Sequence, residues 1–267
     1  MFYIIILLIL FKKNNNIKYL SHKEFINITN SSDYFQKMNK YDLKVRKCNT
    51  KEEYLKKYQS GYKHFNIIEQ IILLYIVNII DKKIKKFKKF KSIPWIFVKL
   101  NSTLENGYPH TLQNVIILPS NFFMNYSINT IIHEKVHIYQ RIYYNYTEIL
   151  YNLWGFTKVN INFDNNRNNP DLFNNYSYNN NLLIQLYNNN PNELYDSKPY
   201  LINLINNKKN IINKTIINDN NLPNIYINRL EHPNEIMAEM ITLYITNNYN
   251  KNDKWFNNLD EWIKKYF

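Results

Sequence analysis

The segment TIIHEKVHIYQR, residues 130–141, constrains the fold of this chain more than any other. In an α-helix, residues four positions apart lie on the same face, so His133 and His137 would point in one direction. The flanking positions are apolar, at Ile131, Ile132, Val136 and Ile138. This pattern predicts a helix that packs on a sheet through its apolar side and turns its two histidines toward a cleft.

Two imidazoles on one helix face can bind one metal ion. Zinc takes imidazole nitrogen at about 2.0–2.1 Å and, in catalytic sites, keeps one coordination position for water. Glu134, directly after His133, would reach that water without being a ligand. With six His and twelve Glu in 267 residues, the H-E-x-x-H spacing would arise about 0.006 times by chance. The alternative is a helix with two hydrogen-bonded surface histidines.

A stable site needs a third protein ligand. The segment HPNEIMAEMI places Glu235 near the start of a predicted helix, 98 residues after His137, with Glu239 one turn further on. Glu235 would be the ligand, and Glu239 would accept the far ring N–H of a liganding histidine. Otherwise, Glu235 would simply pair with the helix dipole. The rival third ligands are Glu231, His232 and His110.

Short strands are predicted at residues 95–100 (WIFVKL) and 114–119 (NVIILP), because both runs are β-branched or aromatic and are bounded by turn residues. Residues 21–92 have helical patterns, and Thr50 with Glu53 forms a capping-box signature there. Further helices are predicted at 127–142 with Ser127 as N-cap, from there to 154 after a break, at 233–246 with Pro233 first, and at 252–267. The Asn-rich residues 156–230 read as loops with two candidate strands, NLLIQLY and NIYINRL.

The predicted fold is therefore α+β, mostly helical, with a small sheet beside the H-E-x-x-H helix. Residues 1–20 would form an apolar N-terminal segment, residues 21–92 a helical region and residues 93–267 the metal-binding domain.

The formal net charge is +13, and seven lysines lie in DKKIKKFKKFK, residues 81–91. This run favours the solvated end of a long helix over a membrane or nucleic-acid patch.

The first eleven residues, MFYIIILLILF, are continuously apolar. A bilayer span needs about 20 such residues, and the run has neither a preceding basic region nor a following small-residue cleavage site. It would be a marginal membrane anchor, an uncleaved signal-like segment or a buried first element. The single cysteine, Cys48, excludes a disulfide framework and a Cys-based zinc site, and favours a reducing compartment.

TIIHEKVHIYQR followed by NEIMAE resembles the zincin metallopeptidases, specifically those with a downstream glutamate ligand, the gluzincin pattern. The chain is also similar to uncharacterised metallopeptidase-like proteins of large DNA viruses, which share a PHT…N.I.LP segment and an HP.EI.A segment. The counterparts here are Pro109–Thr111, Asn114–Pro119 and His232–Ala238. The resemblance covers roughly residues 95–250. The spacing to Glu235 is longer than in many such enzymes, and no signature of a substrate subsite is evident.

The resemblance implies that His133, His137 and Glu235 hold zinc, that Glu134 is the general base, and that Glu239 lies behind the ligands. It also implies that a peptide pairs with a short strand beside the helix, for which NVIILP is the candidate. The negatively charged oxygen that forms when water attacks the peptide carbonyl needs a hydrogen-bond donor besides the metal. His110 is preferred in that role over Tyr139, Tyr244 and His232.

Arg141, one turn after His137, would pair either with an acid of the site or in an ordinary surface salt bridge, and the surface salt bridge is slightly favoured.

The expected function is zinc-dependent hydrolysis of a peptide or protein substrate. The alternative is a catalytically silent zincin-fold protein that binds membranes or nucleic acid, for example in a virion. A viral chain would act in the host cytoplasm or virion, with membrane association through residues 1–11. The three-ligand site requires the Glu235 carboxylate within about 6 Å of the imidazoles.

Overall fold

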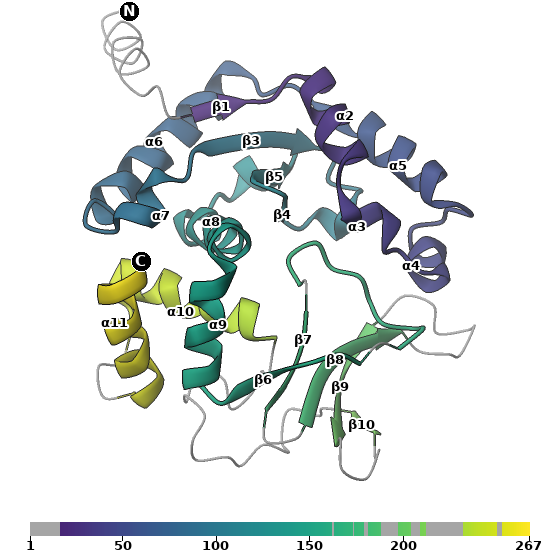
Figure 1. Cartoon of the computed structure of the whole chain (residues 1–267). Helices are drawn as coiled ribbons and strands as arrows, with labels where there is room; N and C mark the ends of the chain where they lie inside the picture. Colours follow the sequence, from purple (N-terminus) through teal and green to yellow (C-terminus); the bar gives the residue numbers. More distant parts are fainter. Residues whose placement is uncertain are drawn as a thin grey trace, which may run out of the picture.

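A computed structural model describes residues 17–161, 163–172, 174–178, 181–187, 197–203, 209–211, 232–249 and 253–267. Figure 1 shows a mixed arrangement of helices and two sheets, with the first sheet near the N-terminal helices and the second built from the Asn-rich part of the chain. The α+β class expected from the sequence is confirmed.

The first sheet has five strands and lies beside helix α8 (Ile128–Ile142). Its strands are β1 (Ile17–Tyr19), β2 (Tyr62–Lys63), β3 (Trp95–Leu100), β4 (His110–Leu112) and β5 (Val115–Pro119). The order is β1-β3-β5-β4, with β2 also paired to β3; β1, β3 and β5 run parallel, whereas β4 is antiparallel to β5. The strands predicted at 95–100 and 114–119 are confirmed. Because β5 pairs on both sides, β4 forms one edge of the sheet, and β1 lies at the other end of the strand order.

Both faces of this sheet are buried. Successive strand residues point to opposite faces, so neighbours in one strand belong to different cores. Phe97 lies in the larger core, which also contains the apolar side of α8. Val98, its neighbour in β3, lies in a second core formed with Phe25 and Tyr58 of the N-terminal helices. Residues 21–92 therefore share their cores with residues 93–267.

The N-terminal region is mostly helical, as predicted. Its helices are α2 (His22–Asn30), α3 (Asp33–Gln36), α4 (Lys40–Val45), α5 (Lys51–Ser60), α6 (Ile67–Lys83) and α7 (Lys88–Ser92). Thr50 caps α5 by accepting from the Glu53 N–H, but the Glu53 carboxylate accepts from the Asn49 N–H instead of closing a reciprocal capping box.

The lysine run does not form the end of one long helix. Helix α6 ends at Lys83, and a turn leads into the short α7. The three apolar residues of the run, Ile84, Phe87 and Phe90, are buried in the larger core. The backbone of the lysine run therefore packs against the rest of the protein. No helix among the described residues has the length and apolar character needed to cross a bilayer. The apolar residues 1–11 lie outside the described part.

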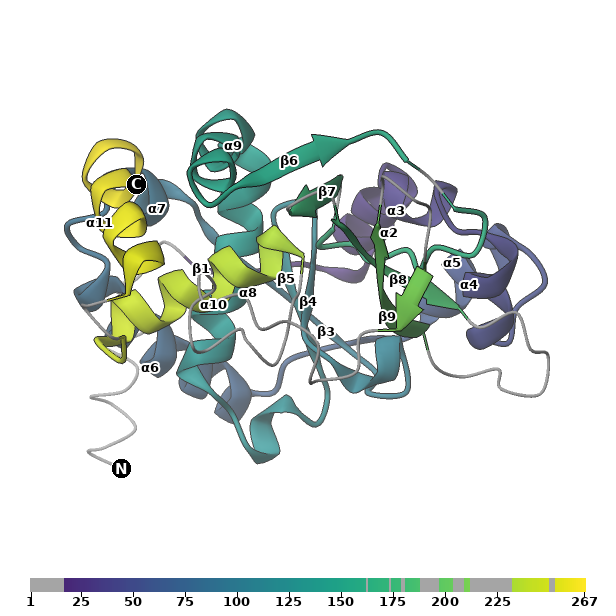
Figure 2. The same cartoon turned by 90° about the horizontal axis from the view of Figure 1, so that it is seen from below.

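The helices of the second half match their predicted positions. They are α8, α9 (Tyr144–Leu153), α10 (Pro233–Thr246) and α11 (Lys254–Tyr266). Short 3-10 turns occur at Glu105–Gly107 and Phe122–Met124. Figures 1 and 2 both show α10 against α8, so two helices far apart in sequence lie side by side.

The Asn-rich part contains a second, antiparallel sheet where mainly loops were predicted. Its strands, in the order β10-β9-β8-β7-β6, are β6 (Phe156–Val159), β7 (Asn175–Tyr178), β8 (Asn181–Tyr187), β9 (Ser197–Asn203) and β10 (Lys209–Ile211). The predicted strand NLLIQLY is β8, in which Leu182, Ile184 and Leu186 alternate and are buried. The segment NIYINRL lies outside the described residues.

Candidate metal centre

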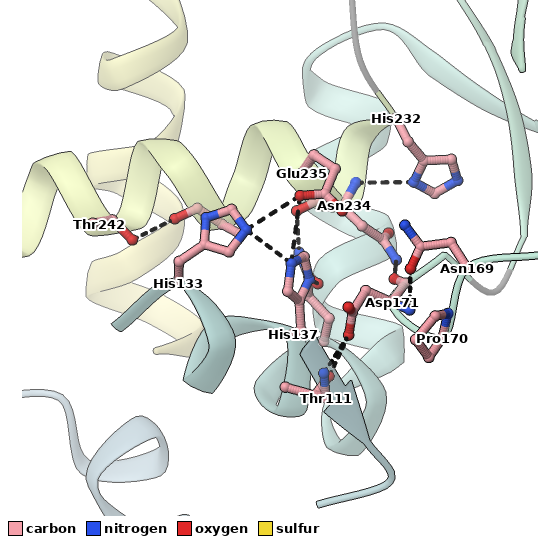
Figure 3. Close-up of polar contacts among 12 residues, drawn as sticks. Thr111, His133, His137, Asn169, Pro170, Asp171, His232, Asn234, Glu235 and Thr242 are labelled. Atoms are coloured by element: carbon pink, nitrogen blue, oxygen red, sulfur yellow. Dashed lines mark hydrogen bonds and ion pairs between the residues drawn. The ribbon is translucent and has the colours of Figure 1, made fainter. Parts of the chain in front are cut away.

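Helix α8 presents the two histidines of the motif. Its first turn is capped by Ser127, whose side chain accepts a hydrogen bond from the Thr130 N–H. Ile132 and Val136 are fully buried in the larger core, which fixes the helix on its apolar side. His133 and His137 lie one turn apart on the neighbouring face of the helix, and Figure 3 shows both side chains directed toward α10.

Helix α10 brings Glu235 to the same place. Pro233 occupies the first helical position, and the His232 side chain caps the helix by accepting from the Asn234 N–H. Glu235 follows in the first turn, and its N–H donates to the His232 carbonyl at 2.9 Å. The carboxylate of Glu235 therefore projects from a fixed helix start toward the two imidazoles.

The three side chains form a compact triangle of ligand atoms. Nε2 of His133 lies 3.0 Å from Nε2 of His137, and Oε2 of Glu235 lies 3.2 Å and 3.5 Å from these two nitrogens. In a tetrahedral zinc site with ligand bonds near 2.05 Å, ligand atoms lie about 3.3–3.4 Å apart. The three distances bracket this value, so the triangle fits a single zinc ion.

The triangle is buried on one side and open on the other. The His137 side chain is 2% exposed, whereas those of His133 and Glu235 are each 24% exposed. Three protein ligands with an accessible side are typical of catalytic zinc sites, whereas structural sites are closed by four protein ligands.

The charges in the triangle favour a cation. Burial raises the pKa of the Glu235 carboxyl, but the two imidazoles, His137 foremost, outweigh it and hold this pKa well below its usual value. Burial lowers the pKa of His137, but the neighbouring carboxylates, Glu235 foremost, raise it to about 10. The buried carboxylate is thus compensated by positive charge, which a divalent cation would also supply.

Glu134, the predicted general base, directly follows His133 in α8. Its side chain is buried, and among the described residues Oε2 of Glu134 is the only buried side-chain oxygen or nitrogen without a hydrogen-bond partner. Burial raises its pKa to about 7, the carboxylates of Asp171 and Glu235 act in the same direction, and the two imidazoles oppose them. An unpaired buried carboxyl oxygen is costly, and such groups often have a functional role.

A hydrogen-bond chain that the sequence reasoning missed supports the ligands from behind. Oε1 of Gln140 lies 2.8 Å from Nδ1 of His137, while Nε2 of Gln140 donates to the Asn234 carbonyl at 2.7 Å. Asn234 is fully buried and also accepts from the Tyr151 hydroxyl at 2.9 Å. These hydrogen bonds therefore link α8, α9 and α10 on the side of the His137 ring that faces away from the triangle.

A second missed residue, Asp171, lies beside His137 in Figure 3. Its Oδ1 accepts from Arg141 at 2.7 Å and from both the N–H and the hydroxyl of Thr111. The Asp171 carbonyl accepts from the Asn234 side chain at 2.7 Å. Arg141 is therefore paired with a buried acid next to the site, and the slightly favoured surface salt bridge was wrong.

His110 was wrongly placed in the site. It is not in the loop before a strand but in β4, where its side chain points away from α8 into the smaller core. Its Nε2 lies 2.6 Å from the Tyr58 hydroxyl and its Nδ1 lies 3.0 Å from the Tyr108 carbonyl. With both ring nitrogens engaged there, His110 lies outside the triangle and is not available as a ligand or as an oxyanion donor.

The other candidates are also displaced from their expected roles. Glu239 is exposed, and in the described part of the chain no hydrogen bond joins it to either imidazole; Gln140 takes the place behind His137. His232 uses both ring nitrogens, for Asn234 and Asn174, so it is a helix cap. The hydroxyls of Tyr139 and Tyr244 donate to Tyr266 and Asp260, respectively. Glu231 lies outside the described residues.

Comparison with known proteins gave no match: no protein-family model, no curated protein and no solved structure is similar to this chain. The case for a function therefore rests on the geometry of the site.

Proposed function

We propose that this chain is a zinc-dependent peptidase with a zincin-like arrangement. The observation that carries the proposal is the triangle of His133, His137 and Glu235, whose ligand atoms lie within 4.8 Å of one another. Two imidazole nitrogens and one carboxylate oxygen, with an accessible side, are a donor set of catalytic zinc enzymes. A small sheet also lies beside α8, and its antiparallel strand β4 forms the sheet edge on that side, which supports the proposal.

Zinc bound to these three side chains would polarise a substrate carbonyl and lower the pKa of a water molecule to about 7. Glu134 is the proton carrier of the reaction. Its Oε2 takes a proton from water as the water oxygen bonds to the carbonyl carbon, and returns it to the amine nitrogen as the carbon–nitrogen bond breaks. Oε2 of Glu134 is buried and has no hydrogen-bond partner, so it is free to take up and release this proton.

The strand that the sequence suggested for pairing with a substrate has no free edge. The strand NVIILP, now β5, pairs with β3 and β4 and has no open edge for a peptide. The strand that could receive a substrate is β4, whose outer edge faces the segment around Asp171. An extended polypeptide at this edge would lie beside α8 and the triangle of ligands.

The decisive experiment compares the wild-type chain with Glu134→Gln. We expect one zinc ion per chain in both, and cleavage of a peptide library by the wild type only. The control is Glu261→Gln, which alters an exposed glutamate of α11 and should cleave like the wild type. A zinc-loaded Glu134→Gln chain that cleaves at the wild-type rate would refute the mechanism. Zinc binding without any cleavage by the wild type would leave the catalytically silent zincin-fold protein.

A further inference from the structure

The outer edge of β4 offers only one residue to a pairing strand. The β4–β5 hairpin turns through Gln113 and Asn114, and Leu112 faces Val115. In a two-residue hairpin, the two residues that flank the turn form two backbone N–H···O=C hydrogen bonds with each other. The next pair of facing residues forms no backbone hydrogen bond between its members. Thr111, opposite Ile116, therefore directs its N–H and carbonyl away from β5, toward the edge where a substrate would pair.

Both outward groups of Thr111 are already occupied by the chain's own side chains. The Thr111 N–H donates to Oδ1 of Asp171 at 3.3 Å, and the Thr111 carbonyl accepts from the Arg141 guanidinium at 3.4 Å. The same guanidinium pairs with Asp171 at 2.7 Å. Thr111 is fully buried as a result, although it belongs to an edge strand.

Further contacts fix this arrangement, which we call the edge clamp (Thr111, Arg141 and Asp171). Arg141 also donates to the carbonyls of Gln113 and Pro170, at 3.0 and 2.8 Å. Figure 3 shows Asp171 beside His137, and the Asp171 carbonyl accepts from the side chain of Asn234, the neighbour of Glu235, at 2.7 Å. The edge clamp therefore lies beside the site of the proposed reaction, on the strand that a polypeptide would need.

We propose that the edge clamp determines which polypeptides reach the metal centre: an extended substrate must displace Asp171 from Thr111, and substrates with an acidic side chain do so most readily. This inference rests on the proposed peptidase function. Arg141 has 20% of its side chain exposed, and displacing Asp171 would leave its guanidinium with carbonyl acceptors but no carboxylate. A partly buried charge that loses its partner is costly, whereas a Glu or Asp of the substrate would restore the pair.

The test measures binding rather than cleavage, in a zinc-loaded chain that carries Glu134→Gln. The probes are two fluorescent decapeptides, identical except for Glu or Gln at one central position, and a copy of the Glu peptide with alternate backbone nitrogens methylated. Adding Asp171→Ala should increase affinity for the Glu peptide about tenfold or more, the effect expected for release of charge-assisted contacts. The methylated peptide, which cannot pair with an edge strand, should gain nothing.

Adding Arg141→Gln to the Asp171→Ala chain should abolish the preference for Glu over Gln. Asp260→Ala is the matched control, because it removes a surface aspartate that pairs with Lys264, and it should change no affinity. Thermal unfolding establishes that each variant is folded. If Asp171→Ala does not fold, Asp171→Asn, which keeps the side-chain shape, should show a smaller gain in the same direction.

Unchanged affinity in a folded Asp171 variant would overturn the inference, as would an equal gain for the methylated peptide. Because binding is measured without Glu134, a gain in affinity can appear even if the wild type never cleaves a peptide. Conversely, wild-type cleavage with no effect of Asp171→Ala would reject the edge clamp and leave the peptidase proposal intact.

Discussion

Gln140 holds His137 in one tautomer. The amide nitrogen of Gln140 donates to the Asn234 carbonyl, so the amide oxygen must face Nδ1 of His137, 2.8 Å away. Nδ1 is therefore the protonated nitrogen when the imidazole is neutral, and the lone pair of Nε2 faces His133 and Glu235. A metal-binding histidine requires this state, and it is commonly fixed by an acceptor behind the ring.

Replacing Gln140 with Met should therefore weaken zinc binding about 10–100-fold, the usual effect of losing such a partner. Affinity would be measured by competition with a coloured chelator. The control is Gln59→Met, which removes a glutamine bonded to Thr29 and Asn30 in the N-terminal region. Equal zinc affinities in the two variants would show that Gln140 has no positioning role.

Zinc should stabilise the folded chain. A ligand that binds only the folded state adds about 4 kcal/mol at a concentration a thousand times its Kd, so the midpoint of thermal unfolding should rise by several degrees. Glu235→Ala should lose most of this rise because it removes one ligand of the triangle. Glu239→Ala, on the same helix but exposed, should keep it. A zinc-dependent rise that survives in Glu235→Ala would exclude this triangle as the binding site.

The partly buried pair of Glu105 and Arg46 should make stability depend on pH. Burial raises the pKa of Glu105, but Arg46, 2.8 Å away, outweighs this and holds it at about 2, against an ordinary 4.5. A pKa lowered on folding gives stability that is present above pH 4.5 and lost as the pH falls toward 2, here about 3 kcal/mol. Urea unfolding between pH 7 and pH 2.5 should show a smaller loss in Glu105→Gln than in the wild type.

Gly107→Ala should destabilise the turn that leads into β4. Gly107 has a φ of +70°, which favours glycine, and an added Cβ would lie 2.9 Å from the Ser102 carbonyl oxygen. We expect a loss of about 1–3 kcal/mol in the free energy of unfolding, measured by urea unfolding. The nearest atom is part of the backbone, so no side chain can move to relieve the contact. A Gly107→Ala chain as stable as the wild type would argue against a conformational constraint at this position.

The parts of the site that the sequence predicted depend on local signals. The spacing of His133 and His137 sets their common face, and Pro233 marks the helix start that carries Glu235. The roles of Gln140 and Asp171 could not be predicted, because they depend on which loop and which helix lie behind the ligands in three dimensions.

His110 shows a different limit. Its place near the predicted cleft strand was correct, but in a strand one position decides the face, and His110 points to the opposite face from the site. The second sheet was missed because asparagine, which usually indicates turns, is abundant throughout this chain and occurs inside strands such as β7.

The separation of the ligands also bears on when the protein could first become active. His137 and Glu235 are 98 residues apart, and the second sheet is synthesised between them. A nascent chain that has emerged only as far as β10 carries two imidazoles but no carboxylate ligand. If the protein is a peptidase, it would remain inactive on the ribosome until α10 has emerged and packed against α8. This delay would protect neighbouring nascent chains from premature cleavage.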